Sequence, residues 1–349
     1  MPDDAIRHAP TSRGPAGEIL LEVITGRADD PDRRIAEFGD AVDAALAATP
    51  DLLHDDDLQL TLFLLYLLHY GPAPYVAGDW EWHPGLLAVR ARIEERFERT
   101  LRAAVTPPDP APTTGADVSA ALFAMTDEVA KPTLAMWAGR HATEDQLREF
   151  LVLRTIYTLR EADPHSWALP RLRGRAKAAM VEIQSDEYGN GRPGRMHAEI
   201  FARTLRGMGL SDEPDHYVDA VPAITLASLN MMSFFGLHRR LRGAVAGQLA
   251  AFEMTSSIPN KHYARAFRRH GHGDDVTWYF DEHVEADAVH EQIAGRDLAG
   301  GLADDEPELI GDIIFGAAAG IHMDGLVGAH IDDAWSNDRS ALREAAHVH

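Results

Sequence analysis

Apolar residues recur along most of the chain at the spacing of an α-helix. Between residues 31 and 46 they stand three or four positions apart, at Ile35, Phe38 and Val42. The run 58–69 is apolar on nearly every side, which is typical of a central, buried helix. No segment shows the sustained alternation with β-branched residues that marks a strand. The pattern therefore predicts an all-α fold.

Local composition divides this pattern into segments. Residues 1–18 are rich in proline, glycine and charge, so we expect a flexible N-terminus. A helical lobe should follow over 19–105, then a proline-rich linker over 106–116 and a larger helical bundle over 117–340. Because the 58–69 helix has no polar face to offer water, the lobe should pack on the bundle or support a homodimer.

Within the bundle, helices are expected over 171–188, 195–208, 238–254 and 259–269, and the first two are separated by an unusual interruption. In "EIQSDEYGNGRPGRMHAEIF", residues 182–201, a helix carrying Glu187 runs into glycines and a proline and resumes with His197. Glycine costs about 1 kcal/mol and proline about 3 in a helix interior, so the interruption marks a boundary or has a purpose. On one unbroken helix Glu187 and His197 would be about 15 Å apart along the axis. A bend would bring this carboxylate and this imidazole toward a common centre.

A second pattern lies in "DEHVEADAVHEQI", residues 281–293. At about 100° per residue, His283, Asp287 and His290 fall on one narrow stripe of a helix. Such a stripe suits a metal such as iron or manganese, which takes mixed nitrogen and oxygen ligands. The alternative is a solvent-facing stripe in an acidic protein with 18 histidines. A metal site in a helical bundle would need matching carboxylates from facing helices.

Glu161 is one candidate for such a carboxylate. The helical pattern of 143–162 ends before Pro164, which places Glu161 in the last turn. The alternative is a solvated helix end, where the helix dipole slightly disfavours a glutamate. Glu253, in FEMTSSIPN, is interpreted as a residue that packs in the core or supports a ligand, rather than as a ligand itself.

The overall composition excludes several kinds of site and argues against several kinds of partner. The chain has no cysteine, which excludes disulfides, thiolate zinc sites, iron–sulfur clusters and cysteine nucleophiles. The net charge of −22 argues against nucleic acid and anionic membrane surfaces as partners. The N-terminus lacks the layout of a signal peptide, and the apolar run 58–70 is too short to span a bilayer. We expect a cytoplasmic protein.

Together these residues resemble the haem-oxygenase-like diiron oxidases, a family of iron-containing redox enzymes. The resemblance covers about residues 117–337 and rests on EADPH at 161–165, EIQSDEYGNG with the downstream His197, FEMTSSIPN at 252–260 and the 283–290 stripe. It implies an all-helical, haem-oxygenase-like scaffold that holds two iron ions in place of haem and activates O2. The metal ligands implied by position are Glu161, Glu187, His197, His283, Asp287 and His290.

The chain departs from the family pattern at one position. Some relatives carry a further carboxylate one helical turn before the second-helix histidine, where this chain has Gly194. Either Glu187 serves alone on that segment, or the second iron is held more weakly. Glu182 and Asp186 are the candidate substitutes on the same segment.

The resemblance implies an O2-dependent oxygenase that oxidises a small nitrogenous metabolite, such as an amino acid, amine or guanidine group, in biosynthesis. Oxidative C–C cleavage or decarboxylation of an amino acid or fatty acid is an alternative, because the ligands do not distinguish the two reactions. A non-enzymatic acidic iron-binding protein is a further alternative, against which stands the lack of paired Glu-x-x-His motifs. The expected partners are the small-molecule substrate, an external electron donor and a second copy of the chain.

Overall fold

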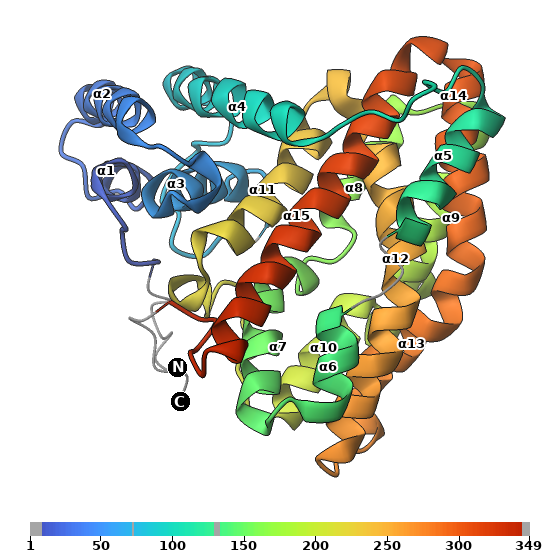
Figure 1. Cartoon of the computed structure of the whole chain (residues 1–349). Coiled ribbons are helices and arrows are strands. Elements are labelled where there is room, and N and C mark those ends of the chain that lie inside the picture. The colour runs from blue at the N-terminus through green and yellow to red at the C-terminus, as the bar shows by residue number, and fades with distance from the viewer. Residues whose placement is uncertain (1–8, 72, 129–132, 344–349) are drawn as a thin grey trace. The chain divides into compact units, whose positions relative to one another are not determined.

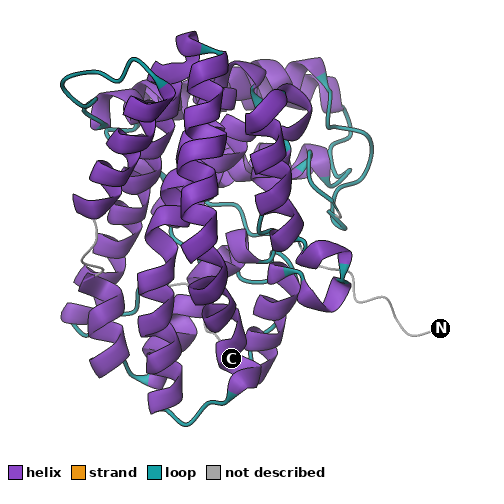
Figure 2. Ribbon diagram, turned by 90° about the vertical axis from the view of Figure 1, so that its right-hand side faces the viewer, coloured by secondary structure: helices purple, strands orange, loops and turns teal. Residues whose placement is uncertain are grey.

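The computed structural model describes residues 9–71, 73–128 and 133–343, apart from the side chains of residues 128, 133 and 285–289. Within these ranges the chain forms helices joined by turns and loops, and it contains no strand (Figure 2). The all-α fold predicted from the apolar spacing is confirmed.

The chain divides into two compact units. The first consists of the residues up to Ala103 together with Val221–Phe234, and the second of Ala104–Ala220 and the chain from Phe235 onward. The segment 221–234 thus belongs to the N-terminal unit, whereas the sequence predicts it within the bundle over 117–340. The helices of the first unit, labelled in Figure 1, are α1 (Pro15–Ile24), α2 (Pro31–Ala48), the 3-10 turn Leu52–His54, α3 (Asp56–Leu67), α4 (Pro84–Ala104) and most of α11 (Ala223–Leu237).

The first unit is built around α3. Every residue from Asp57 to Leu67 is buried, as the all-round apolar pattern predicts. The Asp57 carboxylate accepts hydrogen bonds from the backbone N–H groups of Ala16 and Gly17, at 2.8 and 2.7 Å, and so satisfies two donors at the start of α1. The expectation of a flexible 1–18 segment is therefore wrong from Pro15 onward, because Asp57 holds the first turn of α1.

The second unit contains the longest helices. In it α12 (Arg242–Arg269) packs against both α13 (Asp274–Gln292) and α15 (Ile310–Ser336), as Figure 1 shows. A π-helical stretch, Ile293–Gly300, follows α13. The other helices are α5 (Gly115–Glu128), α6 (Thr133–His141), α7 (Glu144–Thr158), α8 (Asp163–Ser166), α9 (Gly174–Glu187), α10 (His197–Gly207) and α14 (Gly301–Asp305), with 3-10 turns at Leu169–Arg171, Gly189–Gly191, Pro193–Arg195, Val218–Ala220, Arg239–Leu241 and Pro307–Leu309.

α12 is one continuous helix where the sequence predicts two, over 238–254 and 259–269. Pro259 lies inside it. A proline in a helix interior costs about 3 kcal/mol, because it removes a hydrogen bond and crowds the preceding turn. The packing of α12 against α13 and α15 outweighs this local cost, so the predicted division is wrong.

Glycines allow α12 and α15 to approach at backbone distance. A Cβ atom added at Gly247 of α12 would lie 1.8 Å from the carbonyl oxygen of Ile313, and one added at Gly316 of α15 would lie 2.1 Å from that of Ala244. Such distances leave no room for any side chain. The position of α12 in the second unit therefore depends on these two glycines.

α15 also contains a long apolar stretch, in addition to the shorter run 58–70. Together with the preceding 3-10 turn, as Pro307–Ser336, it is long and apolar enough to cross a membrane by length and composition alone. In the structure 39% of its most apolar window is buried, and it packs along α12. Core helices of soluble proteins pass the same test, so the finding is weak evidence for a membrane span.

We predict that Gly316→Ala lowers the free energy of unfolding by about 1–3 kcal/mol, because the new methyl group would force α12 and α15 apart. Gly325→Ala is the matched control on the same helix. A Cβ there would meet no described atom within 4 Å, so this change should stabilise the helix by about 0.5–1 kcal/mol. Chemical denaturation measures both values. Equal effects of the two substitutions would contradict the close packing.

Candidate metal centre

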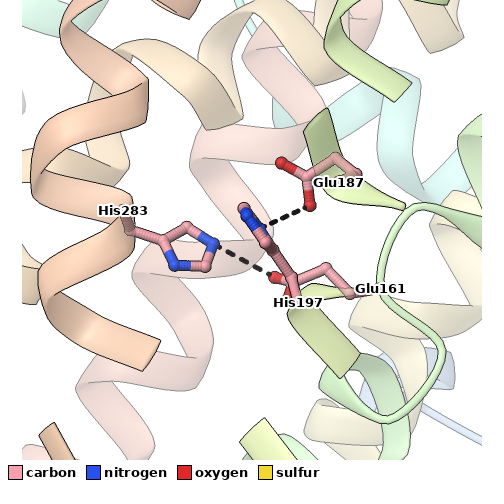
Figure 3. Close-up of side chains that lie close together, drawn as sticks. All are labelled: Glu161, Glu187, His197 and His283. Carbon is pink, nitrogen blue, oxygen red and sulfur yellow. Dashed lines mark ion pairs between the residues drawn. The ribbon is translucent and has the colours of Figure 1, made fainter. Parts of the chain in front are cut away.

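Four buried side chains from separate parts of the second unit meet at one point. Glu161 lies in the turn between α7 and α8, Glu187 is the last residue of α9, His197 is the first residue of α10, and His283 lies in α13. Each offers one ligand atom, and these atoms all lie within 4.8 Å of one another. Figure 3 shows the four side chains converging. We call these residues the first cluster.

The break after α9 brings two of them together. α9 ends at Glu187, two 3-10 turns follow, and α10 starts at His197. Gly189 has a φ of +63°, and a Cβ there would lie 2.5 Å from the carbonyl carbon of Arg195, so only glycine fits this turn. As a result Glu187 Oε2 lies 3.0 Å from His197 Nδ1. The bend inferred from the sequence is present in the structure.

His283 is oriented by its own helix. Its Nδ1 donates a hydrogen bond to the carbonyl oxygen of Tyr279, at 2.7 Å. The proton is therefore on Nδ1, and the lone pair of Nε2 faces the cluster, where Nε2 lies 3.6 Å from Glu161 Oε1. The Tyr279 hydroxyl donates to that same Glu161 oxygen at 2.8 Å. Histidines that bind metals are commonly fixed in this way by a carbonyl oxygen at the second ring nitrogen.

Two atoms of the first cluster are buried without a hydrogen bond inside the described parts of the chain: Glu161 Oε2 and His197 Nδ1. An unsatisfied buried polar atom costs roughly 1–3 kcal/mol. Although His197 Nδ1 is within ion-pair distance of Glu187, the geometry is not that of a hydrogen bond. Carboxylate and imidazole atoms that point at a shared centre rather than at each other fit a bound cation.

A second cluster adjoins the first and shares Glu187 with it. It consists of Glu187, Glu253 of α12 and His290 of α13, whose ligand atoms also lie within 4.8 Å of one another. All three residues are buried. Several residues of the two clusters, including Glu161, Glu187, Glu253 and His283, line one narrow cavity. That cavity has room for little more than a single water-sized sphere, which suits ions.

The protonation equilibria show that this region stabilises positive charge. Burial lowers the pKa of His290, but contact with Glu253 and Asp186 outweighs burial and raises it to about 9. Burial likewise lowers the pKa of His197, and the charge of Glu187 reverses the shift. At Glu187 burial raises the pKa, whereas the charge of His197 and its contact with the carboxylate bring it below its usual value. A site that favours imidazolium ions over neutral rings also favours metal cations.

The structure places the predicted site residues as follows. It brings together Glu161, Glu187, His197 and His283 in the first cluster and His290 with Glu187 in the second. The side chain of Asp287 lies outside the described residues. Gly194 is exposed, as is Glu182.

Glu253, which the sequence indicates as a packing or supporting residue, lies in the second cluster of potential ligands. No local signal marks it, because Glu253 approaches Glu187 and His290 only in the folded chain. Tyr279 was also missed. It stands four residues before His283, so helical spacing places both on one face.

A match to a family model identifies the protein family to which the chain belongs. Residues 148–325, just over half of the chain, match the family model described as iron-containing redox enzyme. The chain belongs to this family. The match contains Glu161, Glu187, His197 and both histidines of α13, so the family's all-α, haem-oxygenase-like fold carries the buried carboxylate and imidazole clusters. The protein is accordingly an oxidoreductase, and iron is the metal that its family indicates.

One curated protein is similar over a shorter stretch. The nitrosourea synthase of Streptomyces achromogenes subsp. streptozoticus is 29% identical over 157 residues, which are 45% of this chain and 33% of that enzyme. The similarity therefore spans about a third of the relative's length.

We predict that Gly189→Ala impairs metal binding, because the new Cβ would collide with the turn that precedes His197. Gly191→Ala is the matched control: its φ of +73° imposes a similar left-handed strain of about 1–2 kcal/mol. A Cβ at Gly191 meets no atom of the described residues within 4 Å. Fe(II) titration under anaerobic conditions should show at least tenfold weaker binding for Gly189→Ala alone. Equally weak binding by both variants would show that backbone strain, not the contact before His197, is responsible.

Proposed function

We propose that this protein is a non-haem diiron oxygenase that uses O2 to oxidise a small nitrogenous metabolite. The observation that carries the proposal is the sharing of buried Glu187 between two clusters of potential ligands. A carboxylate has two oxygens and can contact two cations, so a shared carboxylate supports a two-metal site. The family's description as iron-containing supports iron as the metal.

The proposed ligands fall into two sets. Glu161, Glu187, His197 and His283 would hold one iron, and His290 with the shared Glu187 would hold part of the coordination sphere of the other. Asp287 is retained as a proposed ligand, because it lies on α13 between the two histidines. When bound, iron with open coordination positions would supply the binding and reduction of O2, which no side chain can perform.

The side chains themselves would orient the site and keep it dry. Tyr279 donates to Glu161 and holds this carboxylate toward the centre. The backbone carbonyl of Tyr279 fixes the ring of His283. Tyr157 and Phe252, whose rings pack edge to face at 5.6 Å, line the same cavity and exclude water from one side.

Two observations support the proposed substrate class. The relative that matches over part of its length is named a nitrosourea synthase, a name that implies chemistry at nitrogen. The buried site suits an oxidation that must be protected from water. C–C cleavage or decarboxylation of an amino acid or fatty acid uses the same oxidant, so only products distinguish it from N-oxygenation.

The test is an anaerobic Fe(II) titration followed by exposure to O2, with an external reductant and a panel of amines, guanidines, amino acids and fatty acids. We expect binding of two ferrous ions per chain and O2 consumption that increases with a nitrogenous substrate, with hydroxylated nitrogen in the product. Fragments that have lost carbon would favour the alternative reaction. Absence of iron binding by the folded protein would overturn the proposal.

We predict that Glu187→Gln loses both ions, because Glu187 is common to the two clusters. Glu182→Gln is the control, since Glu182 lies on the same helix but is exposed to solvent. It should bind iron like the unaltered protein. Iron per chain after desalting measures both variants, and retention of both ions by Glu187→Gln would contradict the shared-ligand arrangement.

A further inference from the structure

Arg154 is a cation without a carboxylate paired to it. It lies on α7, seven residues before Glu161, and its Nε atom is buried without a hydrogen-bond partner in the described parts of the chain. Its guanidinium forms no ion pair with a described residue. Arg160 shows the usual arrangement, because its guanidinium lies 2.6 Å from the carboxylate of Asp215. A half-buried guanidinium with an unmatched donor favours a ligand that can accept a hydrogen bond.

Two other polar side chains of the second unit lie near this guanidinium. The Phe150 ring stacks on that of Tyr263 of α12 with centroids 4.2 Å apart, and the guanidinium carbon of Arg154 lies 5.5 Å from the centre of the same Phe150 ring. Tyr263 is 7% exposed, and its hydroxyl makes no hydrogen bond within the described residues. Burial raises the pKa of Asp324 of α15, and the charge of Arg154 opposes that shift. We call Arg154, Tyr263 and Asp324 the polar group.

Tyr279 connects the polar group to the first cluster. Its hydroxyl donates to Glu161 Oε1 at 2.8 Å. Burial raises the pKa of Tyr279 and the charge of Glu161 raises it further, whereas the charge and contact of Arg154 lower it. Burial lowers the pKa of Arg154, but Tyr279 and Glu161 raise it above its usual value, so this group stays a cation. Arg154 therefore lies one side chain away from the first cluster.

The charges of the polar group indicate what it can bind. Arg154 and Asp324 interact through space but form no ion pair, and among the described residues neither has another charged partner. Arg154 is half-buried and Asp324 is exposed, so a solute can reach both. A guanidinium binds a carboxylate through two parallel hydrogen bonds, and an aspartate accepts from an ammonium group. The head of an α-amino acid carries both charges on one carbon, whereas a fatty acid has only the first and a simple amine only the second.

We infer that the polar group binds the zwitterionic head of an α-amino acid substrate, with its carboxylate on Arg154 and Tyr263 and its ammonium on Asp324. The side chain of the amino acid is then free to extend past Tyr279 toward the first cluster. The inference rests on the proposed function and narrows its substrate class. It makes Arg154 a residue that determines specificity for a carboxylate, with no role as a metal ligand.

The test measures binding without turnover, by isothermal titration calorimetry in the absence of O2, with and without Fe(II). The probes are pairs that differ only in the carboxylate: L-arginine with agmatine, L-lysine with cadaverine, and L-leucine with isopentylamine. Hexanoate supplies a carboxylate without an ammonium group. We expect one or more of the amino acids to bind the unaltered protein at least tenfold more tightly than its amine and than hexanoate.

The variants assign this preference to the polar group. Arg154→Gln should lower the affinity for the amino acid at least tenfold, and Arg154→Lys, which keeps the charge but loses the paired donors, should lie between. Asp324→Asn should weaken binding of the amino acid and leave that of hexanoate unchanged. Arg148→Gln is the matched control, because Arg148 is a half-buried arginine of the same helix whose guanidinium donates to the carbonyl oxygen of Met208. Circular dichroism and thermal unfolding establish that each variant is folded.

The outcomes separate this inference from the proposed function. Loss of the preference for the amino acid in Arg154→Gln, with Fe(II) binding as in the unaltered protein and in Arg148→Gln, supports the inference. No preference for any amino acid over its amine in the unaltered protein overturns it. A preference that survives Arg154→Gln while Fe(II) affinity falls also overturns it, because Arg154 would then act only by holding Tyr279 and Glu161. Failure of the unaltered protein to bind iron overturns the proposed function, whatever the amino acids do.

Discussion

The feature on which the rest of the second unit depends is the burial of carboxylates next to one another. Glu161, Glu187 and Glu253 are all removed from water, and Glu187 lies close to each of the others. Burying an ion costs several kcal/mol even after relaxation, and like charges at short range add to that cost. Positive charge at the centre stabilises such an arrangement, and burial also raises the pKa of Glu253, which favours its neutral form. The neighbouring carboxylates accordingly raise the pKa of His197 and of His290 against the effect of burial.

The helices of the unit serve this centre in specific ways. The break between α9 and α10 turns the chain so that the Glu187 carboxylate and the His197 imidazole lie 3.0 Å apart. A regular α13 presents Tyr279 and His283 on one face, and its backbone fixes the histidine ring. Glycine contacts bring α12 against α15 at backbone distance, which sets the position of the helix that carries Glu253. Each of these features is local, and each positions a side chain of the two clusters.

The sequence predicts those features of the fold that depend on residues close together in the chain. Apolar spacing indicates the all-α fold, and the glycines and proline between Glu187 and His197 indicate a bend, because both depend on neighbouring residues. The continuity of α12 through Pro259 could not be predicted, since it depends on packing against α13 and α15. The same holds for Glu253, which approaches Glu187 only in the folded chain. A lone glutamate in a helix gives no local sign of its distant partners. The first turn of α1 depends on Asp57 in the same way.

The family assignment and the geometry address different questions. The match over 148–325 assigns the chain to the iron-containing redox enzymes, but it does not state how many ions bind or which residues hold them. From the two clusters that share Glu187 we propose two ions, with the cluster residues as their ligands. The most direct test is low-temperature EPR of the protein loaded anaerobically with Mn(II) to saturation. Two ions that share a carboxylate should give an exchange-coupled spectrum, which Glu187→Gln abolishes. The spectrum of isolated Mn(II) ions at saturation, unchanged by that substitution, would contradict the shared centre.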